Sequence, residues 1–141
     1  MADANPQQAS VRTVYLTLAM IYPLFLFILF FVSSSSPEGM MPLSLGAFFQ
    51  PYTGENAMVS SVLMVFGLFD LFYFNVCWLP KLLPNARSHL IALIMPEMFA
   101  LFGFIIGIMN NNPWAAVPYV LVAFANYVWV YTKVTESTSS L

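Results

Sequence analysis

The chain has 141 residues, of which 60% are hydrophobic, 17% aromatic and only 7% charged, with a formal net charge of −2. A soluble domain carries about 25% charged residues, so this chain has too few charges to cover a water-exposed surface, and its hydrophobicity excludes intrinsic disorder. The acidic balance argues against a nucleic-acid partner, and the single cysteine, Cys77, excludes an intrachain disulfide and a cysteine-based metal cage.

Four apolar segments are long enough to cross a bilayer, since a transmembrane helix needs about 20 apolar residues. The sequence therefore predicts an all-α, polytopic membrane protein, with one four-helix domain over residues 1–141. The predicted helices cover residues 14–32, 57–79, 88–109 and 114–132, with an outer loop at 33–56. The first segment is longer than the apolar region of a secretory signal peptide, about 7–15 residues, so we expect it to be retained.

Proline and capping residues mark several features of the predicted helices. Pro23 should kink the first helix and Pro80 should end the second, because proline lacks the amide hydrogen that a helix needs. Asn112 followed by Pro113 has the pattern of a cap and a first-turn proline, and should begin the fourth helix.

The basic residues all fall at one end of the predicted helices. They are Arg12, Lys81, Arg87 and Lys133. Loops on the cytoplasmic side of a membrane carry an excess of lysine and arginine. We therefore expect a multi-pass protein of the cell inner membrane, with the amino and carboxyl termini both in the cytoplasm.

The parts outside the predicted helices are polar, with one exception. Residues 1–10 and 135–141 are polar, and we expect them to be loose. Within the outer loop, residues 43–49 are apolar but too short to cross the bilayer. This stretch is either a short segment lying on the membrane surface or a docking surface for a partner.

Two acidic residues, Asp70 and Glu97, lie in the middle of the second and third predicted helices. A carboxylate in hydrocarbon costs a few kcal/mol, so it persists where it is protonated, partnered or useful. Each lies about ten residues from the same end of its helix, which at 1.5 Å per residue places both about 15 Å deep. We expect the two carboxyls to lie within direct or one-water hydrogen-bonding reach and to share a proton, with neither facing lipid. The alternative is that each is simply protonated or bonded to a neighbour such as Asn126.

The residues around Glu97 are suited to a buried polar site and to close helix packing. Pro96 has no amide hydrogen, so it frees the carbonyl of Ala92 one turn away from the carboxyl. Ala100, Gly103 and Gly107 are small, and such residues let another helix approach closely. We favour packing within the bundle over self-association for this pair of glycines.

The run Pro96-Glu97, followed by Ala100, Phe102 and Gly103, resembles the ion-binding helix of rotary ATPase c subunits, the membrane proteolipids. In that family the pattern Pro-Glu-x-x-Ala-x-aromatic-Gly holds the carboxylate that binds a proton or a sodium ion. The resemblance covers about 15 residues and implies that Glu97 is this carboxylate. The preceding helix departs from the family, because it is bulky and has one glycine where a c ring packs glycine- and alanine-rich helices.

Two functions follow from these features. In the first, the protein handles protons or cations, with Glu97 as the reversible carrier, Asp70 as its partner and Pro96, Ala92 and Asn126 in support. In the second, it is a non-catalytic accessory subunit of a larger membrane complex. For the protein in general we expect contact with the lipid bilayer and with other membrane protein subunits or further copies of itself, where a ring of copies would favour the first function and unlike subunits the second. No catalytic arrangement is present and no cluster of histidine and cysteine exists, so we expect neither an enzyme nor a bound metal or cofactor.

The one-sided distribution of basic residues predicts the threading. Reporter domains fused after Leu141 and inserted within residues 33–36 should report opposite sides of the membrane, with the carboxyl-terminal fusion in the cytoplasm. Reporters found on the same side would contradict four membrane spans.

Overall fold

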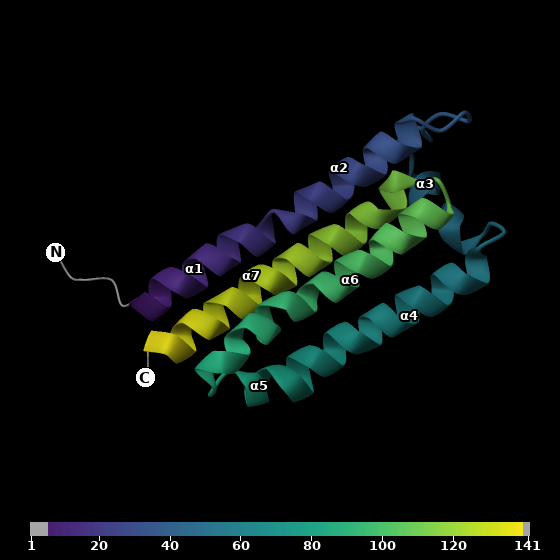
Figure 1. The fold of residues 1–141 in the computed structure, drawn as a ribbon. Helices are drawn as coiled ribbons and strands as arrows, with labels where there is room; N and C mark the ends of the chain where they lie inside the picture. Colours follow the sequence, from purple (N-terminus) through teal and green to yellow (C-terminus); the bar gives the residue numbers. More distant parts are fainter. Residues whose placement is uncertain (1–5, 140–141) are drawn as a thin grey trace.

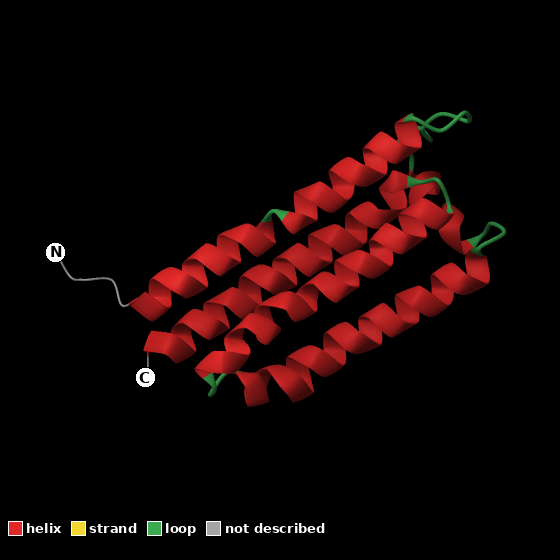
Figure 2. Cartoon of the chain, in the orientation of Figure 1, coloured by secondary structure: helices red, strands yellow, loops and turns green. Residues whose placement is uncertain are grey.

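The structure, a computed structural model, describes residues 6–139. In this range the chain is helical and contains no strand (Figure 2). Four helical stretches are long and apolar enough to cross a membrane. These are Arg12–Ser34, Ala57–Leu82, Ala86–Met109 and Pro113–Ser139. The predicted fold class is therefore confirmed, with small differences at the ends of the helices.

The first stretch is two helices, α1 (Pro6–Ala19) and α2 (Ile21–Ser34), separated at Met20. Pro23 cannot donate a hydrogen bond to the carbonyl four residues earlier, that of Ala19. The amide of Met20 donates to the carbonyl of Thr17 at 3.3 Å. This carbonyl is three residues back, whereas an α-helix bonds four residues back. The kink predicted from Pro23 is thus a break in the helix.

Pro80 does not end the second stretch, contrary to our prediction. This stretch consists of α4 (Ala57–Tyr73), a π-helical turn η2 (Phe74–Trp78) and α5 (Leu79–Leu82). The amide of Leu79 donates to the carbonyl of Phe74, five residues back. The wider turn shifts the hydrogen-bond register just before Pro80, which then occupies the first turn of α5, where a missing amide hydrogen is tolerated.

The third and fourth stretches form the centre of the bundle. A 3₁₀ turn η3 (Ala86–Ser88) leads into α6 (His89–Met109), and a second 3₁₀ turn η4 (Pro113–Ala116) leads into α7 (Val117–Ser139). In the outer loop, α3 (Leu45–Phe49) and the 3₁₀ turn η1 (Gln50–Tyr52) form a short helical segment.

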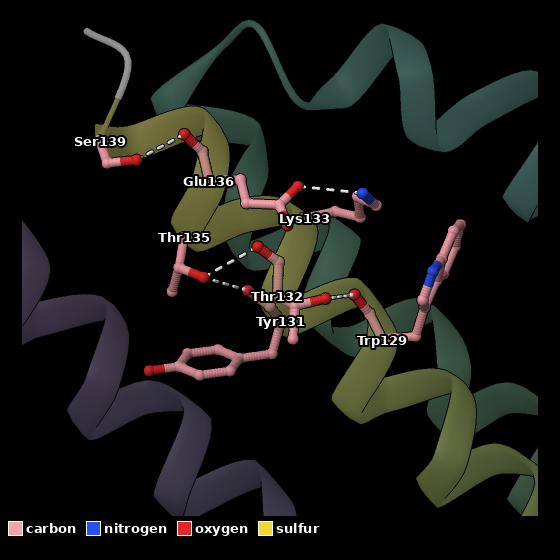
Figure 3. A network of polar contacts seen from close by, with 7 residues as sticks. All are labelled: Trp129, Tyr131, Thr132, Lys133, Thr135, Glu136 and Ser139. Carbon is pink, nitrogen blue, oxygen red and sulfur yellow. Dashed lines mark hydrogen bonds and ion pairs between the residues drawn. The ribbon is translucent and has the colours of Figure 1, made fainter.

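Both polar termini are more ordered than predicted. Residues 6–10 belong to α1, and α7 continues to Ser139. Figure 3 shows polar contacts at the end of α7: the hydroxyl of Thr135 donates to the carbonyl of Thr132 at 2.8 Å, and Lys133 pairs with Glu136 at 2.9 Å. The charge pair is three residues apart within the helix and adds a small stabilisation. Residues 1–5 and 140–141 lie outside the described part of the chain.

The helices run lengthwise beside one another, and α4 lies at the edge of the bundle next to α6 (Figure 1). The start of α1, helix α5 and the end of α7 lie at one end, which we call the inner end (Figure 1). The four basic residues belong to this end of the bundle. The opposite end, the outer end, holds α3 and the turn between α6 and α7 (Figure 1).

Glycines set the contacts of α6 with its neighbours. A Cβ atom at Gly103 would lie 2.7 Å from Cγ of Tyr119 on α7. A Cβ atom at Gly107 would lie 3.1 Å from Leu29 on α2 and 3.3 Å from Ala116 at the start of the last stretch. Gly103 and Gly107 therefore pack within this chain, against α2 and the last stretch.

Gly103→Ala should destabilise the bundle, because the added methyl group overlaps the side chain of Tyr119 and forces α6 and α7 apart. We expect a loss of about 1–3 kcal/mol in the free energy of unfolding, measured as a lower thermal midpoint in one detergent. Gly46→Ala is the matched control, since the nearest atom to its new methyl would be Oγ of Ser44 at 3.7 Å. Equal midpoints for the two variants would contradict the packing described here.

Candidate functional site

Glu97 is half-buried on α6, on the side where α2 and α7 pack. Its Oε1 atom is buried and has no hydrogen-bond partner among the described residues. The carboxyl is close enough to Tyr22 and Tyr127 to interact electrostatically with both hydroxyl groups. Tyr22 belongs to α2 and Tyr127 to α7, so Glu97 points to the side of α6 where these two helices pack.

Tyr22 is a second buried group without a partner. Its side chain is 2% exposed, and its hydroxyl makes no hydrogen bond within residues 12–139. The ring packs on Phe124 and Tyr127, with centroids 5.5 and 5.4 Å away. A buried hydroxyl that lacks a partner costs about 1–3 kcal/mol, so this arrangement calls for an explanation.

A row of tyrosines leads from Glu97 toward the inner end. The hydroxyl of Tyr127 donates to the backbone carbonyl of Tyr15 at 2.6 Å. The ring of Tyr15 stacks on Tyr127 at 5.0 Å and on Tyr131 at 3.7 Å between centroids. We call Tyr22, Tyr127, Tyr15 and Tyr131 the tyrosine row. It connects the depth of Glu97 to the last turns of α7.

The break between α1 and α2 lies at the depth of Glu97. Leu29 packs against Gly107, and the ring of Phe25 lies 5.1 Å from that of Phe104. Counting back along both helices from these two contacts places Ala19 and Met20 level with Glu97. The carbonyl of Ala19, which Pro23 leaves without a donor, is therefore at the same level as the buried carboxyl.

Asp70 shares the depth of Glu97 but makes no hydrogen bond with it. Gly67 packs against Phe99 and Phe102, where a Cβ atom would lie 3.0 Å from each ring, and this contact sets the register of α4 against α6. Three residues further along, Asp70 reaches the level of Glu97, as predicted. Within the described residues neither carboxyl forms a hydrogen bond, so the predicted direct bond between them is absent. Both side chains are half-buried, but Asp70 lies on α4, whereas Glu97 lies near Tyr22 of α2 and Tyr127 of α7.

The other predicted site residues surround this level. Ala92, Pro96 and Ala100 are buried in the contact surface of α6. Asn126 on α7 is at the same depth as Glu97, counting from the contact between Tyr119 and Gly103, and its buried Nδ2 atom has no partner among residues 12–139. Glu97, Asp70 and Asn126, with the break at Met20, form what we call the mid-depth layer.

Three consecutive asparagines, neither of the first two predicted as a site residue, form a cluster of polar contacts at the outer end. Asn110 Nδ2 donates to Ser60 Oγ at 3.2 Å, and Asn111 Nδ2 donates to Ser36 Oγ at 3.1 Å. Asn112 Nδ2 donates to the carbonyl of Ala47 at 2.5 Å. Each asparagine thus ties the turn after α6 to a different segment.

The same asparagines close the end of α6. Asn111 has a positive φ of 47°, a conformation that asparagine tolerates better than most residues. The amide of Asn112 donates to the carbonyl of Gly107 at 2.9 Å, which is the bond pattern of a helix ending in a Schellman motif. Three asparagines directly after an apolar helix were the available signal, since they supply both the turn and the donors.

The chemistry that this arrangement allows is proton or cation exchange at one carboxyl. A buried carboxyl without a partner is far less costly neutral than ionised, so it favours a bound proton. Within residues 6–139 no three histidine, cysteine, aspartate or glutamate side chains gather as a metal site. Comparisons with protein-family models, curated proteins and solved structures give no match.

We predict that a hydrophobic carbodiimide labels Glu97, because this reagent reacts with protonated carboxyls in lipid. Labelling should fall as the pH rises, since the ionised carboxylate does not react. Mass spectrometry of the labelled peptide gives the site, and Glu97→Gln serves as the control that removes it. Labelling that does not change between pH 6 and pH 9 would contradict a titratable Glu97.

Proposed function

We propose that the protein takes up and releases protons, or small monovalent cations, at Glu97 inside the membrane. The observation that supports this most directly is the buried Oε1 atom of Glu97, which has no hydrogen-bond partner in the described chain. A structural carboxyl would be expected to have a donor, because an unmatched buried polar group is costly. A site that must exchange its proton instead keeps an acceptor available.

The break between α1 and α2 supports the same proposal. Ion sites of membrane transporters lie near the middle of the bilayer and are often built at discontinuous helices, whose unwound carbonyls coordinate a proton or sodium ion. Here the carbonyl of Ala19, which lacks its helical donor because of Pro23, lies near the depth of the unpartnered hydroxyl of Tyr22 and the carboxyl of Glu97. These oxygens suit a water molecule, a hydronium ion or a sodium ion.

Access to Glu97 is proposed from the inner end. The tyrosine row extends from Glu97 in that direction, and its hydroxyl groups are the polar atoms along this path. In the other direction Leu29, Gly107 and Ala116 pack closely and leave an apolar barrier. By the positive-inside rule we assign the inner end to the cytoplasm of the cell inner membrane.

The local resemblance to rotary ATPase c subunits supports a carrier role for Glu97, and the rest of the chain limits how far the resemblance extends. Helix α4 has a single glycine, Gly67, in its contact with α6, and it exposes bulky residues such as Phe66, Phe69 and Phe72. A tight inner ring has no room for such a helix. We therefore propose a single-carboxylate carrier and not a conventional rotor subunit.

The position of α4 favours a second candidate, a non-catalytic accessory subunit of a larger membrane complex. Helix α4 packs mainly on α6, so most of its surface is available for contacts outside the bundle. Its exposed residues are large and apolar, which suits a protein partner as well as lipid. Under this alternative the acids stabilise the fold and do not exchange protons.

Reconstitution separates the two candidates. In proteoliposomes with an imposed membrane potential and an internal pH-sensitive dye, the wild-type protein should conduct protons, and Glu97→Gln should lower the rate at least tenfold. Glutamine keeps the shape and a donor but cannot release a proton. Glu38→Gln, which makes the same change in the exposed outer loop, is the control and should conduct normally.

A folded Glu97→Gln protein with the wild-type rate would decide against the carrier. Gel filtration and the thermal midpoint show whether each variant is folded. If wild-type protein itself conducts no protons, and native mass spectrometry shows unlike subunits bound, the accessory role is supported.

A further inference from the structure

A cavity of about 300 Å³ lies between α4 and α7, away from Glu97 and independent of the proposed carrier function. Its floor is formed by Phe99, Ala115 and Tyr119, which are nearly fully buried. Leu68 of α4 and Val122 of α7 form its rim and are 49% and 45% exposed. The cavity therefore opens between the two helices, on the side that faces the hydrocarbon of the membrane.

The outer end of this cavity is covered by the short helical segment of the outer loop. Phe48 and Tyr52 line it from α3 and η1. Asn112 holds this segment in place through its bonds to the Ala47 carbonyl and to Gln50 Oε1, the latter at 3.2 Å. The covering segment separates the cavity from the water at the outer end, so an occupant enters from the bilayer.

The polar groups at the cavity exclude a polar ligand. The hydroxyls of Tyr52 and Tyr119 are hydrogen-bonded to each other, and the remaining lining is hydrocarbon or aromatic. Apolar cavities of this kind do not hold water, because a water molecule needs several polar partners. The occupant is therefore apolar over the part that enters the cavity.

The size of the cavity and its depth in the membrane limit further which molecules can occupy it. The cavity holds about 300 Å³ and is open along the side that faces the bilayer, so it suits a slender apolar group such as a single hydrocarbon chain. Val122 lies nine residues after Pro113, where the last stretch begins, which at 1.5 Å per residue is less than about 15 Å. The cavity thus lies in the outer half of a hydrocarbon core that is about 30 Å thick.

We propose that this cavity is a binding site for one acyl chain of a phospholipid in the outer-end leaflet. The chain enters between Leu68 and Val122 and packs on Phe99 and Tyr119. The headgroup then lies at the level of the exposed residues of the outer loop, such as Phe49 at its membrane-facing edge.

Photocrosslinking tests this proposal. The wild-type protein is reconstituted in nanodiscs with a phosphatidylcholine that carries a diazirine on one acyl chain, and the labelled residues are identified by mass spectrometry. Met64 and Leu68, which line the cavity, should be labelled several-fold more than Phe69, which follows Leu68 on α4, does not line the cavity and is 64% exposed. Val122 should likewise exceed its neighbour Leu121, also 61% exposed.

A cavity-filling variant provides the second measurement. Leu68→Trp should lower the labelling of Met64 several-fold, whereas Phe69→Trp, the matched change on the lipid-facing side of α4, should leave it unchanged. Equal labelling of cavity and lipid-facing residues in the wild-type protein would show bulk lipid only and overturn the proposal, even if Leu68→Trp does not fold. Labelling of the cavity below that of the controls, with a protein partner or another lipophilic molecule retained on purification, would overturn it as well.

Discussion

The contact between Gly103 and Tyr119 holds α6 and α7 together, and other parts of the structure depend on it. Because Gly103 has no side chain, the Tyr119 side chain lies directly against the backbone of α6. From there its ring packs on Phe99, with centroids 5.1 Å apart, and Phe99 in turn fills the space beside Gly67 of α4. The hydroxyl of Tyr119 reaches Tyr52 and so positions the outer loop. The absence of a side chain at Gly103 thus allows the contacts that α7, α4 and the outer loop make with α6 and with one another.

The polar groups of the bundle are arranged differently at its two ends and in its middle. At the outer end, three asparagines donate to separate segments, and the buried Oδ1 atom of Asn112 is left without a partner among the described residues. At the inner end, hydroxyls along α7 donate to carbonyls of the same helix. In the middle, Oε1 of Glu97, the hydroxyl of Tyr22 and Nδ2 of Asn126 are buried without a partner in the described chain. Because unmatched polar groups are costly in hydrocarbon, three of them from three helices at one level make the middle the candidate site.

The bundle also places two different environments on the two sides of α7. The side that faces α1 and α2 holds the tyrosine row and the approach to Glu97. The side that faces α4 is apolar and leaves a cavity, because α4 packs mainly on α6. The phenyl ring of Phe99 and the ring of Tyr119 lie between this cavity and the interior of the bundle. The two proposed sites are therefore separate, and each can be tested without disturbing the other.

The sequence by itself determined the four spans, the grouping of the basic residues and the common depth of Asp70 and Glu97. These features follow from the length and apolarity of each segment, since a helix that satisfies its own backbone groups rises a fixed distance per residue. Only the tertiary structure decided which way each helix is rotated. Glycine and aromatic contacts turn Glu97 toward Tyr22 and Tyr127 instead of Asp70. Likewise, the helix continues past Pro80 because of a π turn, which the apolarity of the segment does not predict. The rotation of each helix about its axis depends on contacts with residues that are distant in the sequence. In a helix that is apolar on most sides, the periodicity of the sequence does not indicate where those contacts lie.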